Sequence, residues 1–229
     1  MDYFIAFADI LGTTDRVNRG IFDDIEILDF ANPVGIIAEF NTNIQFSVFS
    51  DSVFIAAPKD EVDNFVSIIS FLYSQWFSDA ILVRSGISYG ELRFVEHGVA
   101  DEIFKKLSNL SYSRVYGKGL IAAHSVESKS GPGALCYVDE IASGLLKSKN
   151  SNYILEGSVD TLVWADARGI EYWSHIFEKR VKQNGLHLTE KRHYYATADY
   201  FSRLALSGKQ LPDRYLYKTM ADSVDEKSR

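Results

Sequence analysis

The sequence predicts an α+β fold, with a largely antiparallel sheet and helices packed on one of its faces. Three observations predict it: short apolar runs typical of strands, two alternating runs joined by a tight turn, and longer stretches with the apolar spacing of helices. Along the chain they follow the order strand, helix, hairpin, helix, strand, helix, strand. The second face of the sheet is therefore expected to need a partner.

The first strand and a hairpin are the clearest strand signals. Residues 3–8 form an aromatic and branched run that ends at Asp9 and a turn of small residues. Residues 43–58 carry two alternating apolar runs around Ser-Asp-Ser, which is typical of a hairpin with Asp51 at its tip. The apolar positions of the two runs are Ile44, Phe46 and Val48, and then Val53 and Ile55.

Helical patterns alternate with the remaining strands. Residues 21–40 are acidic and are expected to be helical. Residues 60–79 have the three-and-four spacing of an amphipathic helix that lies on a sheet. Its apolar positions are Val62, Phe65, Val66, Ile69, Leu72, Tyr73 and Trp76. A strand with two glycines is expected at 80–92, a helix of small residues at 117–128 and, after the turn sequence KSGPG, a strand at 134–139.

The whole chain, residues 1–229, is expected to form one domain, because no linker, repeat or low-complexity tract divides it. The motif-bearing core spans about 3–168. Two helical patterns, the second beginning at Ala196, indicate a C-terminal helical extension over about 169–220. A charged tail at 221–229 is expected to be frayed.

Composition excludes several classes of partner. The formal net charge is -7, so the surface lacks the basic character by which proteins bind nucleic-acid polymers. Cys136 is the one cysteine and has no partner for a disulfide within the chain, which fits a reducing compartment. No apolar run approaches the ~20 residues that span a bilayer, and no leader sequence is evident. We expect a cytoplasmic protein with no membrane or nucleic-acid partner.

Asp9 and Asp51 are the first candidate site. If the first strand pairs antiparallel with the second hairpin strand, the two acids become neighbours. Two carboxylates so close disfavour each other's ionisation unless a cation lies between them, and oxygen ligands alone favour Mg²⁺ or Mn²⁺. The alternative is that Asp9 caps a helix and Asp51 is an ordinary turn acid. Their placement together favours the metal.

The turn after Asp9 is a second candidate. It opens into a helix, so its backbone N–H groups form a cradle for phosphate, and glycine allows close approach. The residues of this cradle are Leu11, Gly12, Thr13 and Thr14.

Four sequence blocks resemble the catalytic domain of the class III nucleotidyl cyclases, which is ferredoxin-like. FADILGTTD is similar to the family's Phe-x-Asp-Ile-x-Gly-Phe-Thr, and FSDSVFIA to its metal-binding hairpin. RSGISYG is similar to its Arg-x-Gly-Ile-x-x-Gly strand, and YGKGLIAAHSVES to its dimer-proximal helix. The blocks lie in the family's order over roughly residues 3–128, which is more specific than any one of them.

The resemblance implies two-metal chemistry. Asp9 and Asp51 would bind two ions of Mg²⁺ or Mn²⁺ per site, assisted by the Ile10 carbonyl. One ion would help the ribose 3′-hydroxyl attack the α-phosphate, and the other would neutralise the triphosphate and the leaving pyrophosphate. The family forms its sites between two such domains, so a homodimer with sites at the interface is expected.

Departures from the family concern base recognition and the dimer-proximal helix. Ser47 stands where purine cyclases have lysine or glutamate, and Arg114 where they have the second purine-reading residue. Ile121 and Ser125 replace the asparagine and arginine of the helix. Neither purine code is present.

Two classes of function remain. One is a catalytically inactive, cyclase-like sensor that binds a nucleotide. The other is a cyclase for a different nucleotide, which the intact acid pair favours. The chain most resembles the stand-alone pyrimidine cyclases of bacterial Pycsar anti-phage systems. That resemblance implies a uridylate cyclase converting UTP to 3′,5′-cyclic UMP, which activates a downstream effector. A cytidylate cyclase, which converts CTP to cyclic CMP, is the near alternative.

Weaker candidates surround this site. Arg84 would reach a phosphate, or would be a strand arginine facing solvent. Lys118 would replace the missing arginine, or would be a surface charge. A small base would fit a pocket edged by Ser47, Phe49, Arg114 and Tyr116.

Overall fold

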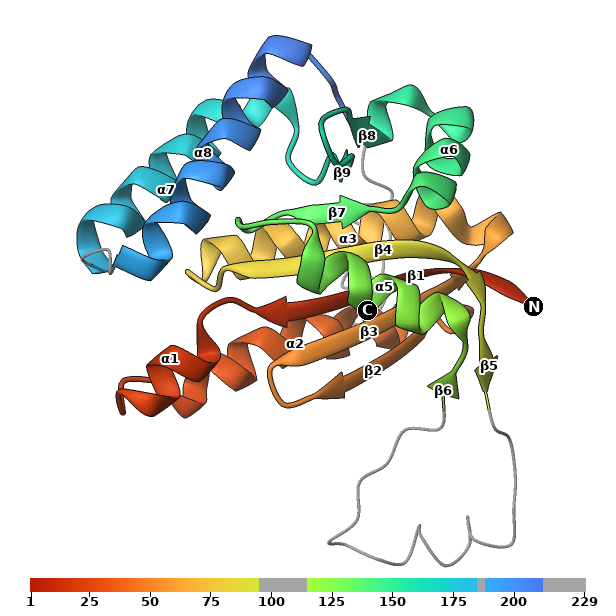
Figure 1. The fold of residues 1–229 in the computed structure, drawn as a ribbon, viewed down its shortest axis with the longest axis horizontal. Coiled ribbons are helices and arrows are strands. Elements are labelled where there is room, and N and C mark those ends of the chain that lie inside the picture. The colour runs from red at the N-terminus through yellow and green to blue at the C-terminus, as the bar shows by residue number, and fades with distance from the viewer. Residues whose placement is uncertain (95–114, 185–187, 212–229) are drawn as a thin grey trace, which may run out of the picture.

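The computed structural model describes residues 1–94, 115–184 and 188–211 and has a seven-stranded sheet at its centre (Figure 1). The strands run in the order β2-β3-β1-β4-β7-β9-β8. Their bounds are β1 Asp2–Ile10, β2 Gln45–Phe49, β3 Ser52–Pro58, β4 Val83–Glu91, β7 Cys136–Val138, β8 Ile154–Leu155 and β9 Thr161–Leu162. All neighbours are antiparallel except β4 and β7. The predicted α+β class and largely antiparallel sheet are confirmed. A separate pair joins β5, Arg93–Phe94, to β6, Val115–Tyr116.

Seven α-helices lie in the described residues. They are α1 Thr13–Asn18, α2 Asp24–Phe40, α3 Val62–Ser78, α5 Lys118–Lys129, α6 Glu140–Lys149, α7 Ile170–Asn184 and α8 Leu188–Ser207. Short 3-10 turns occur at η1 Lys59–Glu61, η2 Ser151–Tyr153 and η3 Ala167–Gly169. The sequence did not predict α6, β8 or β9, and α8 begins before Ala196. Within the described ranges, no helix is both long and apolar enough to cross a membrane.

The alternation along β1 divides the molecule into two layers. Phe4 and Ala8 belong to the main core on one face of the sheet, whereas Ile5 belongs to a second cluster on the other face. Phe7 and Asp9 share the side of Ile5, because successive side chains of a strand point to opposite faces. Asp9 therefore lies on the face opposite the main core.

The main core lies between the sheet and the helices α2 and α3. All seven apolar positions predicted along α3 are buried, which confirms that helix and its orientation. Trp76 of α3 stacks on Phe30 of α2 and donates from Nε1 to the Phe30 carbonyl at 2.9 Å. These two helices share one face of the sheet, as expected.

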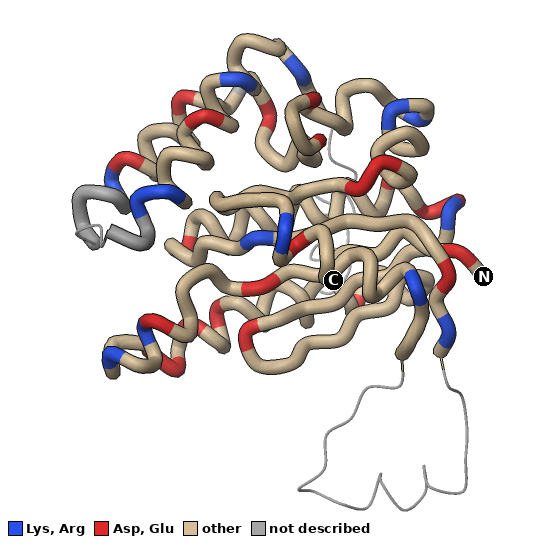
Figure 2. Tube along the Cα trace, in the orientation of Figure 1, with Lys and Arg blue, Asp and Glu red and all other residues tan. Residues whose placement is uncertain are grey.

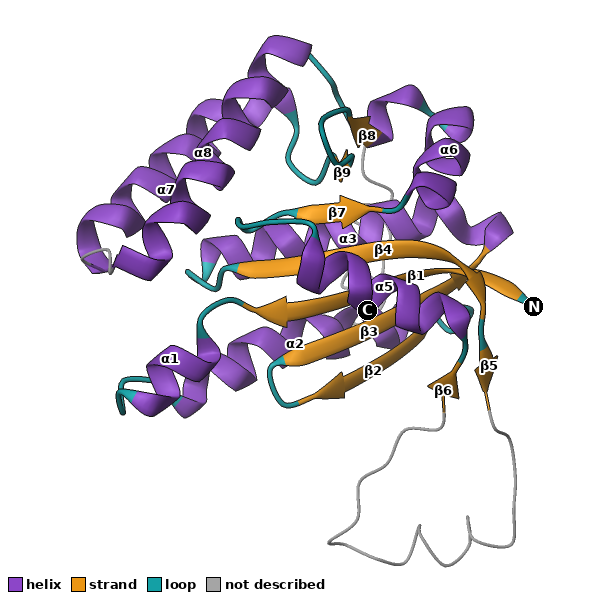
Figure 3. Cartoon of the chain, in the orientation of Figure 1, coloured by secondary structure: helices purple, strands orange, loops and turns teal. Residues whose placement is uncertain are grey.

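Helix α5 lies on the other face, over β1 and β4 (Figure 3). Small residues permit this close approach. A Cβ on Gly86 of β4 would lie 2.2 Å from the Ala123 carbonyl oxygen, and one on Gly119 would lie 2.4 Å from the Ile5 side chain. The second face is thus partly covered within the chain. Helix α5 runs from Gly119, beside Gly90, to Glu127, which pairs with Arg84 opposite Asp9 near the end of β1.

The C-terminal helices α7 and α8 pack onto the main core through aromatic side chains. Trp164 is fully buried and stacks on Tyr200 of α8, with ring centroids 5.7 Å apart. Phe77 of α3 contacts both Phe177 of α7 and Phe201 of α8. The last part of the predicted extension and the charged tail, residues 212–229, lie outside the described residues.

Candidate active site

The structure brings Asp9 and Asp51 together. Strands β1 and β3 pair antiparallel as predicted, with Asp9 opposite Ser52. The Ile10 N–H donates to the Asp51 carbonyl oxygen at 3.0 Å, which ties the hairpin tip to the end of β1. Ser50 turns the tip with a left-handed φ of 55°. The first strand differs in one respect, because it continues past Asp9 to Ile10 instead of ending at the acid.

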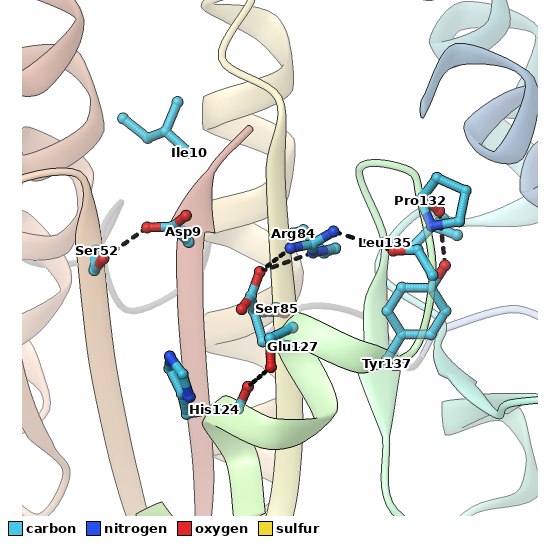
Figure 4. A network of polar contacts seen from close by, with 12 residues as sticks. Asp9, Ile10, Ser52, Arg84, Ser85, His124, Glu127, Pro132, Leu135 and Tyr137 are labelled. Atoms are coloured by element: carbon cyan, nitrogen blue, oxygen red, sulfur yellow. Dashed lines mark hydrogen bonds and ion pairs between the residues drawn. The ribbon is translucent and has the colours of Figure 1, made fainter. Parts of the chain in front are cut away.

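Asp9 occupies a partly buried position with few compensating charges. Its carboxylate accepts a hydrogen bond from Ser52 Oγ at 2.7 Å (Figure 4). Burial raises its pKa to about 6, and the negative charges of Asp51 and Glu127 add to the rise. A carboxylate whose ionisation is penalised by burial and by a second carboxylate is a site that a divalent cation would stabilise.

The residues present fit a divalent cation. Their donors are two carboxylates and the Ile10 carbonyl, which already accepts from Thr13 Oγ1 at 3.1 Å and keeps a second lone pair. In the described part of the chain, no three His, Cys, Asp or Glu side chains gather as metal ligands. The rest of a coordination shell would therefore come from water and substrate oxygens, which is how Mg²⁺ is usually held.

A cavity of about 730 Å³ opens beside the two acids. Its lining includes Asp9 and Asp51, the turn at 10–14, and Arg84. The volume is within the range of small-molecule and cofactor sites. The structure therefore gathers the predicted acids, the predicted cradle and Arg84 around one space.

The turn at 11–14 supplies fewer free donors than expected. The Leu11 N–H donates to the Leu82 carbonyl at 2.8 Å and is therefore not available to a phosphate. The prediction that Leu11 is part of the cradle is wrong. Gly12 takes a left-handed φ of 79° and precedes α1. The first turn of a helix leaves N–H groups without intrahelical acceptors, so Gly12, Thr13 and Thr14 remain candidates for the cradle.

Arg84 is held in place by a residue that the sequence did not identify. It lies directly opposite Asp9 in the β1–β4 pair. Its Nη2 forms an ion pair with Glu127 of α5 at 2.6 Å, and its Nη1 donates to the Gly131 carbonyl at 3.2 Å (Figure 4). Glu127 is buried on the α5 face that also carries Gly119 and Ala123. An acid at the end of this small-residue face is the signal by which the sequence could have revealed the pair.

The residues expected to read the base do not line this cavity in the same chain, and neither does Lys118, the candidate to replace the missing arginine. Ser47 and Phe49 lie on the edge strand β2, where Phe49 is 76% exposed. Tyr116 ends β6 and Lys118 begins α5, and the two lie together at the end of α5 that is far from Asp9. Arg114 lies outside the described residues. None of the four that the structure describes is among the residues that line the cavity.

Helix α8 contributes wall residues that no sequence pattern indicated. Arg192 and His193 line the cavity together with the two acids. They come from the C-terminal extension and follow no motif, so only the packing of α8 reveals them. Basic segments occur on α1 and near the start of α8, on the two sides of the end of β1 (Figure 2).

Comparison with known proteins supports the fold assignment. No family model matches the sequence. The curated proteins contain no match either. Among solved structures, a bacterial light-regulated adenylyl cyclase has a TM-score of 0.50 and 14% identity, over 78% of this chain and 97% of that one. The monomeric guanylyl cyclase domain of the RhoGC fusion protein from the aquatic fungus Blastocladiella emersonii has a TM-score of 0.50 and 14% identity, over 71% and 94%.

A further structure of a bacterial light-regulated adenylyl cyclase has a TM-score of 0.51 and 15% identity, and the match covers 72% of this chain and 53% of that one. At such low identity the likeness concerns the arrangement of strands and helices. This chain therefore has the fold of the class III nucleotidyl cyclase catalytic domain.

Proposed function

We propose that this protein is a nucleotidyl cyclase, and specifically a uridylate cyclase that converts UTP to 3′,5′-cyclic UMP and pyrophosphate. One observation carries the proposal: within a cyclase fold, Asp9 and Asp51 meet on the wall of a cavity of about 730 Å³. A protein that only bound a nucleotide would have little need of two carboxylates held at such a point.

Asp9, Asp51 and the Ile10 carbonyl would hold two ions of Mg²⁺ or Mn²⁺. When bound, such ions supply activation of the ribose 3′-hydroxyl and neutralisation of the phosphate charge. Asp9 is suited to this role because its burial raises the pKa to about 6, so the carboxylate gains from a nearby cation yet is ionised at neutral pH. Ser52 fixes the carboxylate by its hydrogen bond.

The chain's own groups would position the triphosphate. Gly12, Thr13 and Thr14 line the cavity where α1 begins, and their N–H groups, which have no acceptor within the helix, would bind phosphate oxygens. Arg84, held by Glu127, places a positive charge on β4, directly across from Asp9 on β1. Preorganised donors of this kind stabilise charge that develops during phosphoryl transfer without having to reorient.

A homodimer would complete the base pocket. Phe49 and Tyr116 are 76% and 53% exposed, and Ser47 lies on β2 with Phe49. Lys118, the candidate to replace the missing arginine, begins α5 close to Tyr116. Because these side chains are away from the cavity of their own chain, they would contact a nucleotide only as part of a second copy, with Arg114 as a further candidate. Sites at the interface of two copies follow.

The pyrimidine preference rests on the sequence, because Ser47 and Arg114 replace both purine-reading residues. We propose further that cyclic UMP made in the cytoplasm activates a separate effector in anti-phage defence. Cytidylate cyclase activity is the second outcome that the same assay would reveal.

The test is to incubate the purified protein with Mn²⁺ and each of the four ribonucleoside triphosphates, and to identify cyclic products by mass spectrometry. Cyclic UMP is expected from the natural protein and none from Asp51→Asn, whereas Asp60→Asn, at an exposed acid of η1, should keep full activity. Cyclic AMP or GMP as main product would reject the pyrimidine assignment. If no cyclic product forms, the enzyme proposal fails, and binding of UTP in the same samples would indicate a sensor.

A further inference from the structure

Helix α8 forms one wall of the cavity, although it belongs to the C-terminal extension. Arg192 and His193 line the same space as Asp9, Asp51 and Arg84. In Figure 1 the start of α8 and helix α1 lie on the two sides of the end of β1. These two residues could merely enclose the cavity, or they could also bind the ligand that the cavity holds.

The position of α8 is fixed by the turn that precedes β7. The Gly133 N–H donates to His193 Nδ1 at 3.0 Å, and the Ala134 N–H donates to Thr197 Oγ1 at 2.9 Å. Thr197 is fully buried. Gly133 has a φ of 116°, and a Cβ there would lie 3.1 Å from the Ala196 Cβ. The helix is therefore packed closely against this turn at a defined register.

The same turn supports Arg84. The Gly131 carbonyl accepts from Arg84 Nη1 at 3.2 Å, two residues before the N–H that holds His193. Arg84 and His193 thus have a common support, and each lines the cavity. The turn at 131–133 therefore links the sheet to the C-terminal extension beside the cavity, where a triphosphate would lie.

His193 lines the cavity and keeps one ring nitrogen, Nε2, beside Arg192. A neutral imidazole has one acceptor nitrogen, and the Gly133 N–H takes it at Nδ1, so Nε2 carries the proton. Burial lowers the pKa of His193 to about 4, helped by the charges of Arg192 and Arg84, which keeps the ring neutral. Arg192 Nε also points at this Nε2, at 3.3 Å, as if to donate to it. A neutral imidazole cannot accept at both nitrogens, so the shorter bond from the Gly133 N–H excludes the one from Arg192. Both nitrogens are donors, so an anionic oxygen that accepted from both would relieve the contact.

Arg192 also differs from the other arginines of the cavity in its charge balance. Arg16 pairs with Glu26 and Arg84 pairs with Glu127. Among the described residues, no acid forms an ion pair with Arg192, whose side chain is exposed on the cavity wall. A guanidinium in this position, beside a neutral N–H donor, is suited to a phosphate group.

We propose that Arg192 and His193 of α8 bind the terminal phosphates of the nucleoside triphosphate held in the same chain. This inference rests on the proposed function, since it adds residues to the site of that reaction. The C-terminal extension then becomes part of the substrate site, and the end of the triphosphate lies between α1 and α8.

Inorganic tripolyphosphate with Mn²⁺ tests the inference without a base or a turnover. Its affinity would be measured by calorimetry for the natural protein and for Arg192→Ala, Arg192→Lys and Lys191→Ala. Loss of a charged hydrogen bond predicts a roughly tenfold or greater weakening in Arg192→Ala, with part of the affinity kept in Arg192→Lys. Lys191 is exposed, is the neighbour of Arg192 on α8 and does not line the cavity, so Lys191→Ala should bind like the natural protein.

His193→Asn provides a second arm, because its side-chain oxygen can still accept from the Gly133 N–H while the Nε2 donor is lost. Weaker tripolyphosphate binding at unchanged melting temperature is expected. Natural-protein affinity in both Arg192→Ala and His193→Asn, or no binding by the natural protein, overturns the inference. If the natural protein makes a cyclic nucleotide while Arg192→Ala binds tripolyphosphate normally, only the inference fails. If nothing is cyclised but Arg192→Ala loses binding, only the proposed function fails.

Discussion

Arg84 stands directly opposite Asp9 in the antiparallel β1–β4 pair, and yet its ion pair, at 2.6 Å, is with Glu127 of α5. The Asp9 carboxylate accepts instead from Ser52. The guanidinium is thus paired with Glu127 and not with Asp9, whose pKa its charge lowers only as a minor contribution. The negative charge of Asp9 remains for a cation, while the positive charge of Arg84 remains on the cavity wall.

Replacing Glu127 should disturb the site by releasing Arg84. In Glu127→Gln the guanidinium would turn toward Asp9 and compete with Mn²⁺, so Mn²⁺ affinity should fall about tenfold. The free energy of unfolding should drop by about 1 to 3 kcal/mol, because a hydrogen bond to a charged and largely buried partner is weakened. Urea denaturation and Mn²⁺ titration measure the two effects. Glu140→Gln, at an exposed position of α6, should change neither, and an unchanged Mn²⁺ affinity in Glu127→Gln would contradict this role.

Removing the charge of Asp9 should stabilise the metal-free protein. Burial raises the pKa of this carboxyl to about 6, so its folded form binds a proton more readily than its unfolded form. The stability that follows is fully present below the unfolded pKa and is lost as the pH rises through about 6. At pH 7.5, Asp9→Asn should therefore raise the unfolding free energy by on the order of 1 kcal/mol, after allowance for partial exposure.

Two controls accompany the Asp9→Asn measurement. The gain should shrink at pH 4, where the natural carboxyl is protonated in the folded protein. Addition of Mn²⁺ should raise the melting temperature of the natural protein and leave that of Asp9→Asn nearly unchanged. A variant that is less stable at pH 7.5 and still responds to Mn²⁺ would show that Asp9 has a structural role.

Mn²⁺ affinity should depend on pH through the same carboxyl. A bound cation requires the ionised form, so protons and Mn²⁺ compete. Because the pKa of Asp9 is raised to about 6, the dissociation constant should be nearly flat above pH 7 and should rise about tenfold per unit well below pH 6. Electron paramagnetic resonance of free Mn²⁺ gives the measurement. Constant affinity between pH 7 and pH 5 would rule out Asp9 as a ligand.

The approach of α5 to the sheet should tolerate no side chain at Gly86. An added Cβ would lie 2.2 Å from the Ala123 carbonyl oxygen and 2.3 Å from the Glu127 N, and both are backbone atoms. Gly86→Ala should cost about 3 kcal/mol or more and displace Glu127 from Arg84. Gly144→Ala is the matched control, since nothing lies within 4 Å of its added Cβ inside α6. That change should stabilise the protein by up to about 1 kcal/mol, as measured by thermal unfolding.

Much of the fold could be predicted where a pattern is long enough to be distinctive. The repeat from Val62 to Trp76 in α3 extends over several turns, and every predicted apolar position is buried. The hairpin around Asp51 could also be predicted, because alternating apolar and polar residues on both sides of a tight turn are characteristic of two paired strands. By contrast, β8 and β9 have two residues each, and α6 is a short helix that contains Gly144, a poor helix former. Such short elements are stabilised by pairing with neighbouring strands and by packing against distant side chains, which no local pattern reveals.

The site divides in the same way. The meeting of Asp9 and Asp51 follows from pairing two recognisable strands, so the sequence was sufficient. The bond from Leu11 to Leu82 and the wall formed by Arg192 depend on contacts between segments far apart in the chain. Neither has a local signature. The exposed positions of Phe49 and Tyr116 likewise depend on where α5 and the hairpin lie in the folded chain.

The place of β1 inside the sheet bears on how the protein is made. Its partners β3 and β4 and the cavity wall α8 all follow it along the chain. During translation the strand that carries Asp9 therefore waits, apolar and unpaired, until its neighbours have left the ribosome. The cavity is closed later still, once α8 has been synthesised. Nascent chains would acquire the acids early and the capacity to hold a nucleotide only at the end, so ligand binding would mark the completion of folding.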